Sequence, residues 1–440
     1  MNYYPLIRKL ILILGDIACL FCATLLAIFL ELGTAQTGKI IFHMEFLPIL
    51  IILMFFMFNV YGLFSLVRKR LADIFLNLIV AVLNIYIIAM ALTFFGRSFD
   101  YSRIVLVYSG IISLILLAIW QYICHRWDVK NLPQVTAVLF AGQEEADILK
   151  EKINKIYGLT NAVKQIITDI KDTPDWRKQA ASHELIFIGA KVLIADKEEI
   201  VRYARSARKQ IFIAPTIYEL ACSNAGLVIA DDIPLQRVTR LLLTAEQKML
   251  KRTLDIIVSL ISIIILLPVM LITAIAIKLD SKGPVIYSQE RVGQYGKTFK
   301  VHKFRSMRQD AEAKTGPVFA GENDPRITKF GRFMRATRLD ELPQLINVLK
   351  GEMSIVGPRP ERPFFVEQFI KEKPEYAYRH NVKPGITGLA QIAGKYNTTA
   401  YDKLVYDLIY IQNVSVINDL TIMLQTLKVL ITKESTEGVK

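Results

Sequence analysis

The sequence predicts three structural parts: a membrane α-helical N-terminal bundle, an α/β Rossmann-like middle domain, and a mostly α (α+β) C-terminal domain with a re-entrant membrane helix. Three observations predict them. Four apolar runs occupy residues 1–128, short β-rich runs alternate with polar helical stretches over residues 131–245, and a fifth apolar run with a central proline opens residues 251–440.

The four N-terminal runs are each long enough to cross a bilayer. The chain has 440 residues, 53% of them apolar, and a mean hydropathy of +0.36. About 20 apolar residues cross the hydrocarbon core as a helix. We therefore expect transmembrane helices at Leu10–Leu32, Phe46–Leu66, Leu71–Phe95 and Ile104–Cys124.

Basic residues in the short loops predict the orientation. Arg8 and Lys9 precede the first run and Arg68–Arg70 lie between the second and third, whereas the loop after the first run carries only Lys39. By the positive-inside rule, both ends of this bundle and all that follows face the cytoplasm. The formal charge of +14 suits anionic headgroups or phosphates, and no nucleic-acid motif accompanies it.

The middle part reads as a parallel sheet with a poor dinucleotide fingerprint. Strand-like runs such as "VTAVLFAG" alternate with helical stretches, a pattern typical of βαβ units. The turn "AGQEEAD" has one glycine, Gly142, and its carboxylates Glu144, Glu145 and Asp147 would repel a phosphate. We favour a structural, regulatory or oligomerising role over nucleotide binding.

The fifth apolar run, Thr253–Ile277, is predicted to enter the membrane and return. Its 25 residues would reach about 37 Å as a helix. Pro268 kinks or breaks that helix, and both flanks are basic, with Lys251 before and Lys278 after. A full crossing would export a dense basic region against the charge rule, so we expect a re-entrant helix; a kinked transmembrane helix is the alternative.

The 120 residues after this run gather basic residues beside glycines, prolines and aromatics. One set is Lys297, Lys300, Lys303, Arg305 and Arg308, and another is Arg326, Lys329, Arg332, Arg335 and Arg338, with Arg291 ahead of both. A solvated basic face is the ordinary explanation of charge runs. The interleaved turn residues favour phosphate binding instead.

Within this region an acidic pair, Asp340 and Glu341, precedes Pro343. Proline is tolerated in the first helical turn, and "PQLINVLK" has helical apolar spacing, so the pair lies at or before a helix N-terminus. Neighbouring arginines should keep both carboxylates ionised. One could then attack a phosphorus while the other holds Mg²⁺; a cap with salt bridges is the alternative.

Two further arginines are candidate phosphate ligands. Arg359 stands between Pro358 and Pro360, whose fixed φ angles would hold its planar guanidinium in place. Arg379 and His380 could contact phosphate or base.

With these residues in view, the chain from about Lys251 onward resembles the bacterial sugar transferases, the polyprenyl-phosphate hexose-1-phosphate transferases of the monotopic phosphoglycosyl transferase superfamily. The motifs that carry the resemblance, in order, are "KRTLDI", the Pro268-broken run, "SKGPVIYSQERVG", "FKVHKFRSM", "DPRITKFGRFMR", "LDELPQLINVLKGEMSIVGPRP" and "KPGITGLAQ". Residues 1–250 resemble, more loosely, the N-terminal extension of long-form members. Many members break the membrane helix at Ser-Pro, whereas Leu267 precedes Pro268 here.

The resemblance implies a reaction and its residues. A UDP-sugar, galactose or glucose by family, would give its sugar 1-phosphate to undecaprenyl phosphate and release UMP, as the first membrane step of exopolysaccharide, capsule or O-antigen synthesis. Asp340 would be the nucleophile that forms a phosphosugar-enzyme intermediate, and Glu341 its partner with Mg²⁺ as cofactor. The phosphate-binding candidates are Arg359, Lys303, Arg305, Arg326, Arg291 and Arg379.

The resemblance also implies a multi-pass protein of the bacterial cytoplasmic membrane, with its catalytic domain facing the cytoplasm. Its expected partners are the UDP-sugar, undecaprenyl phosphate and membrane lipid, with a homodimer left open and nucleic acid not expected. A membrane-anchored nucleotide-sugar dehydratase and a non-enzymatic polysaccharide scaffold or regulator are the alternatives. None of the eighteen tyrosines has a lysine four residues later, which the dehydratase would need.

Overall fold

A computed structural model of the chain describes residues 4–32, 44–64, 70–96, 102–131, 136–154, 162–223, 226–230, 233–237, 241–308, 324–394 and 399–431. Its contacts divide the chain into two compact units, Met1–Thr216 and Ile217–Lys440. Lys39 and Arg68, which the predicted orientation uses, lie outside the described residues.

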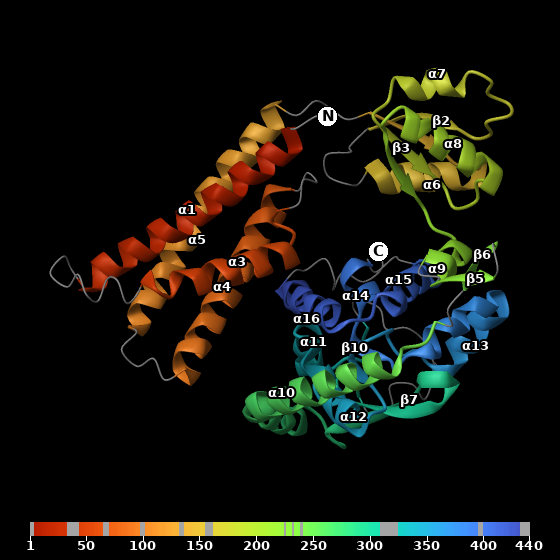
Figure 1. The fold of residues 1–440 in the computed structure, drawn as a ribbon. Helices are drawn as coiled ribbons and strands as arrows, with labels where there is room; N and C mark the ends of the chain where they lie inside the picture. The colour runs from red at the N-terminus through yellow and green to blue at the C-terminus, as the bar shows by residue number, and fades with distance from the viewer. Residues whose placement is uncertain are drawn as a thin grey trace. The chain divides into compact units, whose positions relative to one another are not determined.

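The first unit begins with the apolar helices α1 (Tyr4–Leu32), α3 (Leu47–Val60), α4 (Leu71–Phe95) and α5 (Arg103–Asn131) (Figure 1). By length and composition α1, α4 and α5 could cross a membrane. The second predicted span is shorter than expected, since 14 helical residues reach only about 21 Å of a core about 30 Å thick.

Polar contacts pair α1 with α5 in antiparallel order. Arg8 near the start of α1 forms an ion pair with Asp128 near the end of α5. Gln121 of α5 donates to Asp16 of α1 at 3.0 Å, so this buried carboxylate has a hydrogen-bond partner.

The same unit contains a four-stranded parallel sheet in the order β2-β1-β3-β4, which confirms the predicted strand and helix alternation. Its elements are β1 (Ala137–Phe140), α6 (Gln143–Asn154), β2 (Val163–Ile167), α7 (Trp176–Ala181), β3 (Leu185–Ile188), α8 (Ile194–Ser206) and β4 (Gln210–Ile213). The apolar runs that predicted these strands form a separate buried core on each face of the sheet.

The second unit starts with α9 (Ile217–Ser223), β5 (Gly226–Ala230) and β6 (Ile233–Arg237). The sequence placed residues 217–245 in the middle domain. Leu220 of α9 is instead buried in the core of the second unit with Val356 and Leu408. Burial of this apolar side chain joins α9 to the second unit.

Helix α10 (Ala245–Asp280) follows, and it starts at a capping box formed by Thr244 and Gln247. It contains the predicted run Thr253–Ile277 and continues through Pro268 as one element, so this proline does not end the helix. Only 11% of its most apolar 18-residue window is buried, and α10 is also long and apolar enough to span a membrane.

The rest of the unit is a small α+β fold around a large buried core, with a smaller apolar cluster of Ile277, Phe304 and Met334 beside the end of α10. Its elements are the antiparallel hairpin β7 (Ile286–Val292) and β8 (Thr298–Phe304) with the 3₁₀ turn η1 (Gln294–Gly296) between them, α11 (Lys329–Ala336), the 3₁₀ turn η2 (Leu339–Glu341), α12 (Gln344–Lys350), β9 (Ser354–Val356), α13 (Pro363–Glu372), the 3₁₀ helix η3 (Pro374–Asn381), β10 (Gly385–Thr387), α14 (Leu389–Ala393), α15 (Ala400–Gln412) and α16 (Val416–Ile431). Strands β9 and β10 pair in parallel.

Candidate active site

The acidic pair lies in η2, directly ahead of α12, as its sequence predicted. Arg338, just before the turn, adopts a left-handed backbone conformation with φ of 58°. A non-glycine residue in this region stores strain, and such residues cluster at functional sites. The turn places Asp340 and Glu341 in the interior, where they are 7% and 9% exposed.

Two cations converge on one oxygen of Glu341. Lys303 Nζ from β8 and Arg359 Nη2 from the turn after β9 each lie 2.9 Å from Glu341 Oε1. Three segments separated by up to 56 positions, 303 to 359, therefore meet at this carboxylate.

Asp340 differs from its neighbour. Among the residues that the structure describes, its Oδ1 is a buried oxygen without a hydrogen-bond partner. Burial raises the pKa of Asp340, the charge of Glu341 raises it further, and the charges of Lys303 and Arg335 offset this only in part.

Glu341 is held ionised. Burial alone would raise its pKa, but the charges of Arg359 and Lys303 outweigh burial and keep the pKa well below its usual range. The neighbouring cations therefore lower the pKa of Glu341 as expected, whereas at Asp340 burial and the charge of Glu341 outweigh them and the pKa is raised.

The other basic candidates have protein partners. Arg305 donates to the main-chain oxygens of Ser281 and Lys282 at 2.7 and 2.9 Å, after the C-terminus of α10. Arg326 pairs with Asp324, two residues before it. Neither is joined to the acidic pair by a hydrogen bond in the described part of the chain.

Arg291 and Arg379 hold the segment that carries Arg359. Arg291 donates to the main-chain oxygen of Pro360 at 3.2 Å, and burial lowers its pKa to about 10. Arg379 is 4% exposed, pairs with Asp407 at 2.9 Å and donates to the main-chain oxygen of Arg359 at 3.0 Å. The sequence offered no sign that Asp407, 28 positions away, would be its partner.

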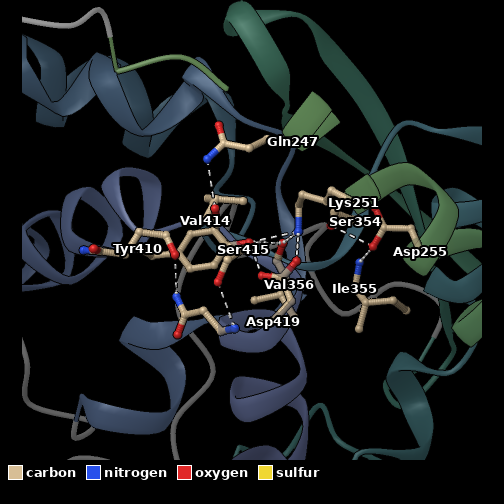
Figure 2. A network of polar contacts seen from close by, with 12 residues as sticks. Gln247, Lys251, Asp255, Ser354, Ile355, Val356, Tyr410, Val414, Ser415 and Asp419 are labelled. Carbon is tan, nitrogen blue, oxygen red and sulfur yellow. Dashed lines mark hydrogen bonds and ion pairs between the residues drawn. The ribbon is translucent and has the colours of Figure 1, made fainter. Parts of the chain in front are cut away.

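A buried polar network holds β9, the strand that precedes this segment (Figure 2). Lys251 in the second turn of α10 donates to Asp419 at 2.7 Å, to Tyr410 at 2.9 Å and to the main-chain oxygen of Val356 at 2.9 Å. Val356 ends β9, three residues before Arg359. The network thus links α10 to the strand that precedes a site arginine.

Asn347 is a further residue that the sequence analysis did not single out. It is fully buried in α12 and bonds to main-chain groups of His302 and Lys300 in β8. These bonds set the spacing between Lys303 and Glu341. Its only sequence signal is a polar residue on the apolar face of a short helix.

Comparisons with known proteins match both the C-terminal part and the middle part of the chain. The family model for bacterial sugar transferases matches residues 246–433, and the model for a CoA-binding domain matches residues 53–218. An exopolysaccharide production protein of Rhizobium leguminosarum is 44% identical over 188 residues, which are 40% of this chain and 92% of that protein. The chain belongs to the bacterial sugar transferase family.

Other bacterial sugar transferases match it over part of their length. The UDP-N-acetylgalactosamine-undecaprenyl-phosphate N-acetylgalactosaminephosphotransferase of Aeromonas hydrophila is 42% identical over 49% of this chain. The UDP-glucose:undecaprenyl-phosphate glucose-1-phosphate transferase of Escherichia coli is 39% identical over 52% of it. The matched region spans 52% and 50% of these two relatives.

Proposed function

We propose that the protein transfers a sugar 1-phosphate from a UDP-sugar to undecaprenyl phosphate and releases UMP. The unpartnered Oδ1 of Asp340, beside a carboxylate that two cations hold ionised, is the observation that carries this proposal. A carboxylate nucleophile needs a free oxygen near a phosphorus and cations near the phosphate oxygens, and this cluster offers both.

The proposed reaction has two displacements at one phosphorus. Asp340 Oδ1 attacks the β-phosphorus of the UDP-sugar, an acyl-phosphate bond forms, and the bond to the UMP oxygen breaks, so UMP leaves with that electron pair. An oxygen of undecaprenyl phosphate then attacks the same phosphorus and breaks the bond to Asp340. The products are a lipid diphosphate sugar and the free carboxylate.

Lys303 and Arg359 would contact the phosphate oxygens during both steps. Their hydrogen bonds to Glu341 fix both cations within 2.9 Å of the pair before substrate arrives. Arg379 and Arg291 hold the backbone of residues 359 and 360, so the guanidinium of Arg359 is oriented in advance.

The acidic pair also fits Mg²⁺. Within the described residues, no group of three or more Asp, Glu, His or Cys side chains could hold a metal. Mg²⁺ commonly binds through one or two carboxylates together with substrate phosphates and water, and Glu341, next to the unpartnered oxygen of Asp340, is the proposed ligand. The bound ion would neutralise charge on the diphosphate.

We further propose that α10 is re-entrant and that the site faces the cytoplasm. A straight 36-residue helix would be about 54 Å long. Near its start Arg252 donates to the main-chain oxygen of Val348 in α12 at 2.6 Å, and just after its end Ser281 accepts from Arg305, which follows β8. Since Asn347 joins α12 to β8, contacts of both ends with this one pair of elements support a bend that returns the chain.

UMP release in the presence of undecaprenyl phosphate and Mg²⁺ tests the activity. The UDP-sugars to compare are those of galactose, glucose and N-acetylgalactosamine. Galactose and glucose are favoured, and relatives are named for each of the three. In the wild type, the covalent phosphosugar should increase the mass of the peptide that contains residue 340, and this increase should survive acid quenching. Asp340→Asn should abolish both UMP release and this mass increase, whereas Asp402→Asn in the first turn of α15 should leave both unchanged. Turnover with none of the UDP-sugars would refute the assignment, and full activity of Asp340→Asn would refute the covalent step.

Membrane-impermeant maleimide tests the topology separately. Lys248→Cys and Lys278→Cys flank the apolar part of α10. In a background without native cysteines, a re-entrant helix exposes both to reagent on the same face of the membrane. Labelling from opposite faces would show a full crossing.

A further inference from the structure

The α/β domain of the first unit has a site where related sheets bind ligands. Strands β1 and β3 are neighbours in the sheet, and the chain leaves them in opposite directions, β1 toward β2 and β3 toward β4. In open parallel sheets, ligands bind at the carboxyl ends of such a strand pair, with phosphates at a helix N-terminus. The match to a CoA-binding domain implies a diphosphate ligand at this edge.

The carboxylate of Glu145 already occupies this edge. Glu145 lies in the first turn of α6, and its two oxygens accept from the backbone N–H groups of Ala190 and Lys191, at 2.9 and 3.2 Å. These amides belong to the loop between β3 and α8. A pair of adjacent backbone donors at the end of a strand is what a ligand phosphate would otherwise use.

The neighbouring glycines show how the loop fits Glu145 and not a ligand. A Cβ atom at Gly189 would lie 2.7 Å from Glu145 Oε2, so this glycine leaves room for the carboxylate. A Cβ atom at Gly142, in the turn where a pyrophosphate would approach, would meet nothing within 4 Å. The space at Gly142 is open, so the contact that distinguishes this edge is the one between Glu145 and the loop after Gly189.

The space that remains is small and acidic. A cavity of about 90 Å³ lies between the ends of β1 and β2 and the loop after β3, lined in part by Asp169, Asp196 and Lys191. Ligand pockets for molecules of cofactor size commonly measure about 300 Å³ or more. Neither the volume nor the two carboxylates suits a nucleotide diphosphate.

We propose that Glu145 acts as an internal anion that occupies the phosphate-binding amides of this domain, so the domain binds no coenzyme A or dinucleotide at this edge. The carboxylate joins the start of α6 to the loop after β3 and closes the crevice between β1 and β3. The domain then serves the protein through its structure, independently of the transferase site.

Hydrogen exchange of the full-length protein in detergent, read on peptides that cover residues 186–195, tests the internal bond. Glu145→Ala should speed exchange at residues 190 and 191 by at least about tenfold, because each amide loses one hydrogen bond to a charged acceptor. Added acetate should slow it again. Glu144→Ala is the matched control, since it removes only the exposed ion pair with Lys191 and should leave those amides slow. Unchanged exchange in Glu145→Ala would overturn the proposal.

Calorimetric titration with coenzyme A, ADP and NAD tests the second part. The wild-type protein should give no saturable heat and no change in exchange at residues 142–145 or 189–191. Saturable binding that protects these amides would overturn the proposal. If Glu145→Ala unfolds the domain, exchange will be fast throughout β1 to β4, and Glu145→Gln then decides. This variant keeps one acceptor oxygen without the charge, so residues 190 and 191 should exchange at a rate between those of the wild type and the alanine variant. Exchange at the wild-type rate would count against the proposal.

Discussion

The side chain of Asn347 offers the sharpest test of how the site is held together. Its Oδ1 accepts from the His302 N–H at 3.0 Å, and its Nδ2 donates to the main-chain oxygen of Lys300 at 2.8 Å and to Glu352 at 2.7 Å. In an antiparallel pair, every second residue directs its backbone N–H and C=O toward the partner strand. Residues 300 and 302 are two apart in β8, so their backbone groups lie on the same edge, the one that faces α12 and not β7. Asn347 satisfies both groups at once.

The change Asn347→Leu keeps the side chain's size and removes all three bonds. Two neutral hydrogen bonds contribute about 1 kcal/mol each and one to a carboxylate about 1.5–3 kcal/mol. Asn347 is fully buried, so we expect local stability to fall by the sum of these contributions, about 4 kcal/mol. Native-state hydrogen exchange of peptides from β8 and α12 measures this free energy of opening.

The same change should lower kcat for UMP release, because β8 carries Lys303 and η2 carries Glu341, whose 2.9 Å contact depends on this junction. Asn413→Leu is a matched control, since Asn413 is exposed and, in the described part of the chain, its side chain donates only to the main-chain oxygen of Ile409; we expect a change within about 0.5 kcal/mol.

Asn347→Asp separates charge from packing. It keeps the acceptor for His302 but sets a carboxylate against Glu352, so it should also destabilise, and adding Glu352→Gln should restore much of the loss. Wild-type stability and turnover in Asn347→Leu would refute the reasoning.

Three further changes test the charges around the site. Burial raises the pKa of Asp340 and the Lys303 charge opposes that rise, so Lys303→Met should move the acid limb of the pH–rate profile to higher pH; an unmoved limb would contradict Asp340 as nucleophile. Lys251→Met leaves the buried Asp419 carboxylate without its cation and should lower the free energy of unfolding, measured by chemical denaturation, by about 3–5 kcal/mol. Adding Asp419→Leu should recover most of this loss. Equal losses in the single and double variants would argue against a stabilising ion pair. Arg379→Lys should lower kcat roughly tenfold with little change in KM for the UDP-sugar. A single ammonium replaces a planar guanidinium that reaches both Asp407 and the main-chain oxygen of Arg359. A rise in KM alone would indicate that Arg379 contacts the substrate instead.

The sequence by itself determined the elements and the acidic pair. Apolar runs near 20 residues and the strand–helix alternation are local patterns, and both appear as predicted in α1, α4, α5 and in β1 to β4. The position of Asp340 and Glu341 before α12 was likewise readable, because Pro343 and the apolar spacing after it are local signals.

Only the tertiary structure decided what each charged side chain does. Three arginines that look alike in sequence have different partners. Arg305 donates to main-chain oxygens after the end of α10, Arg359 pairs with Glu341, and Arg379 donates to the main-chain oxygen of Arg359. Their partners lie 18 to 28 positions away, beyond any local pattern. Burial and charge at the folded site also separate the pKa values of Asp340 and Glu341, adjacent residues that the sequence treats as equals.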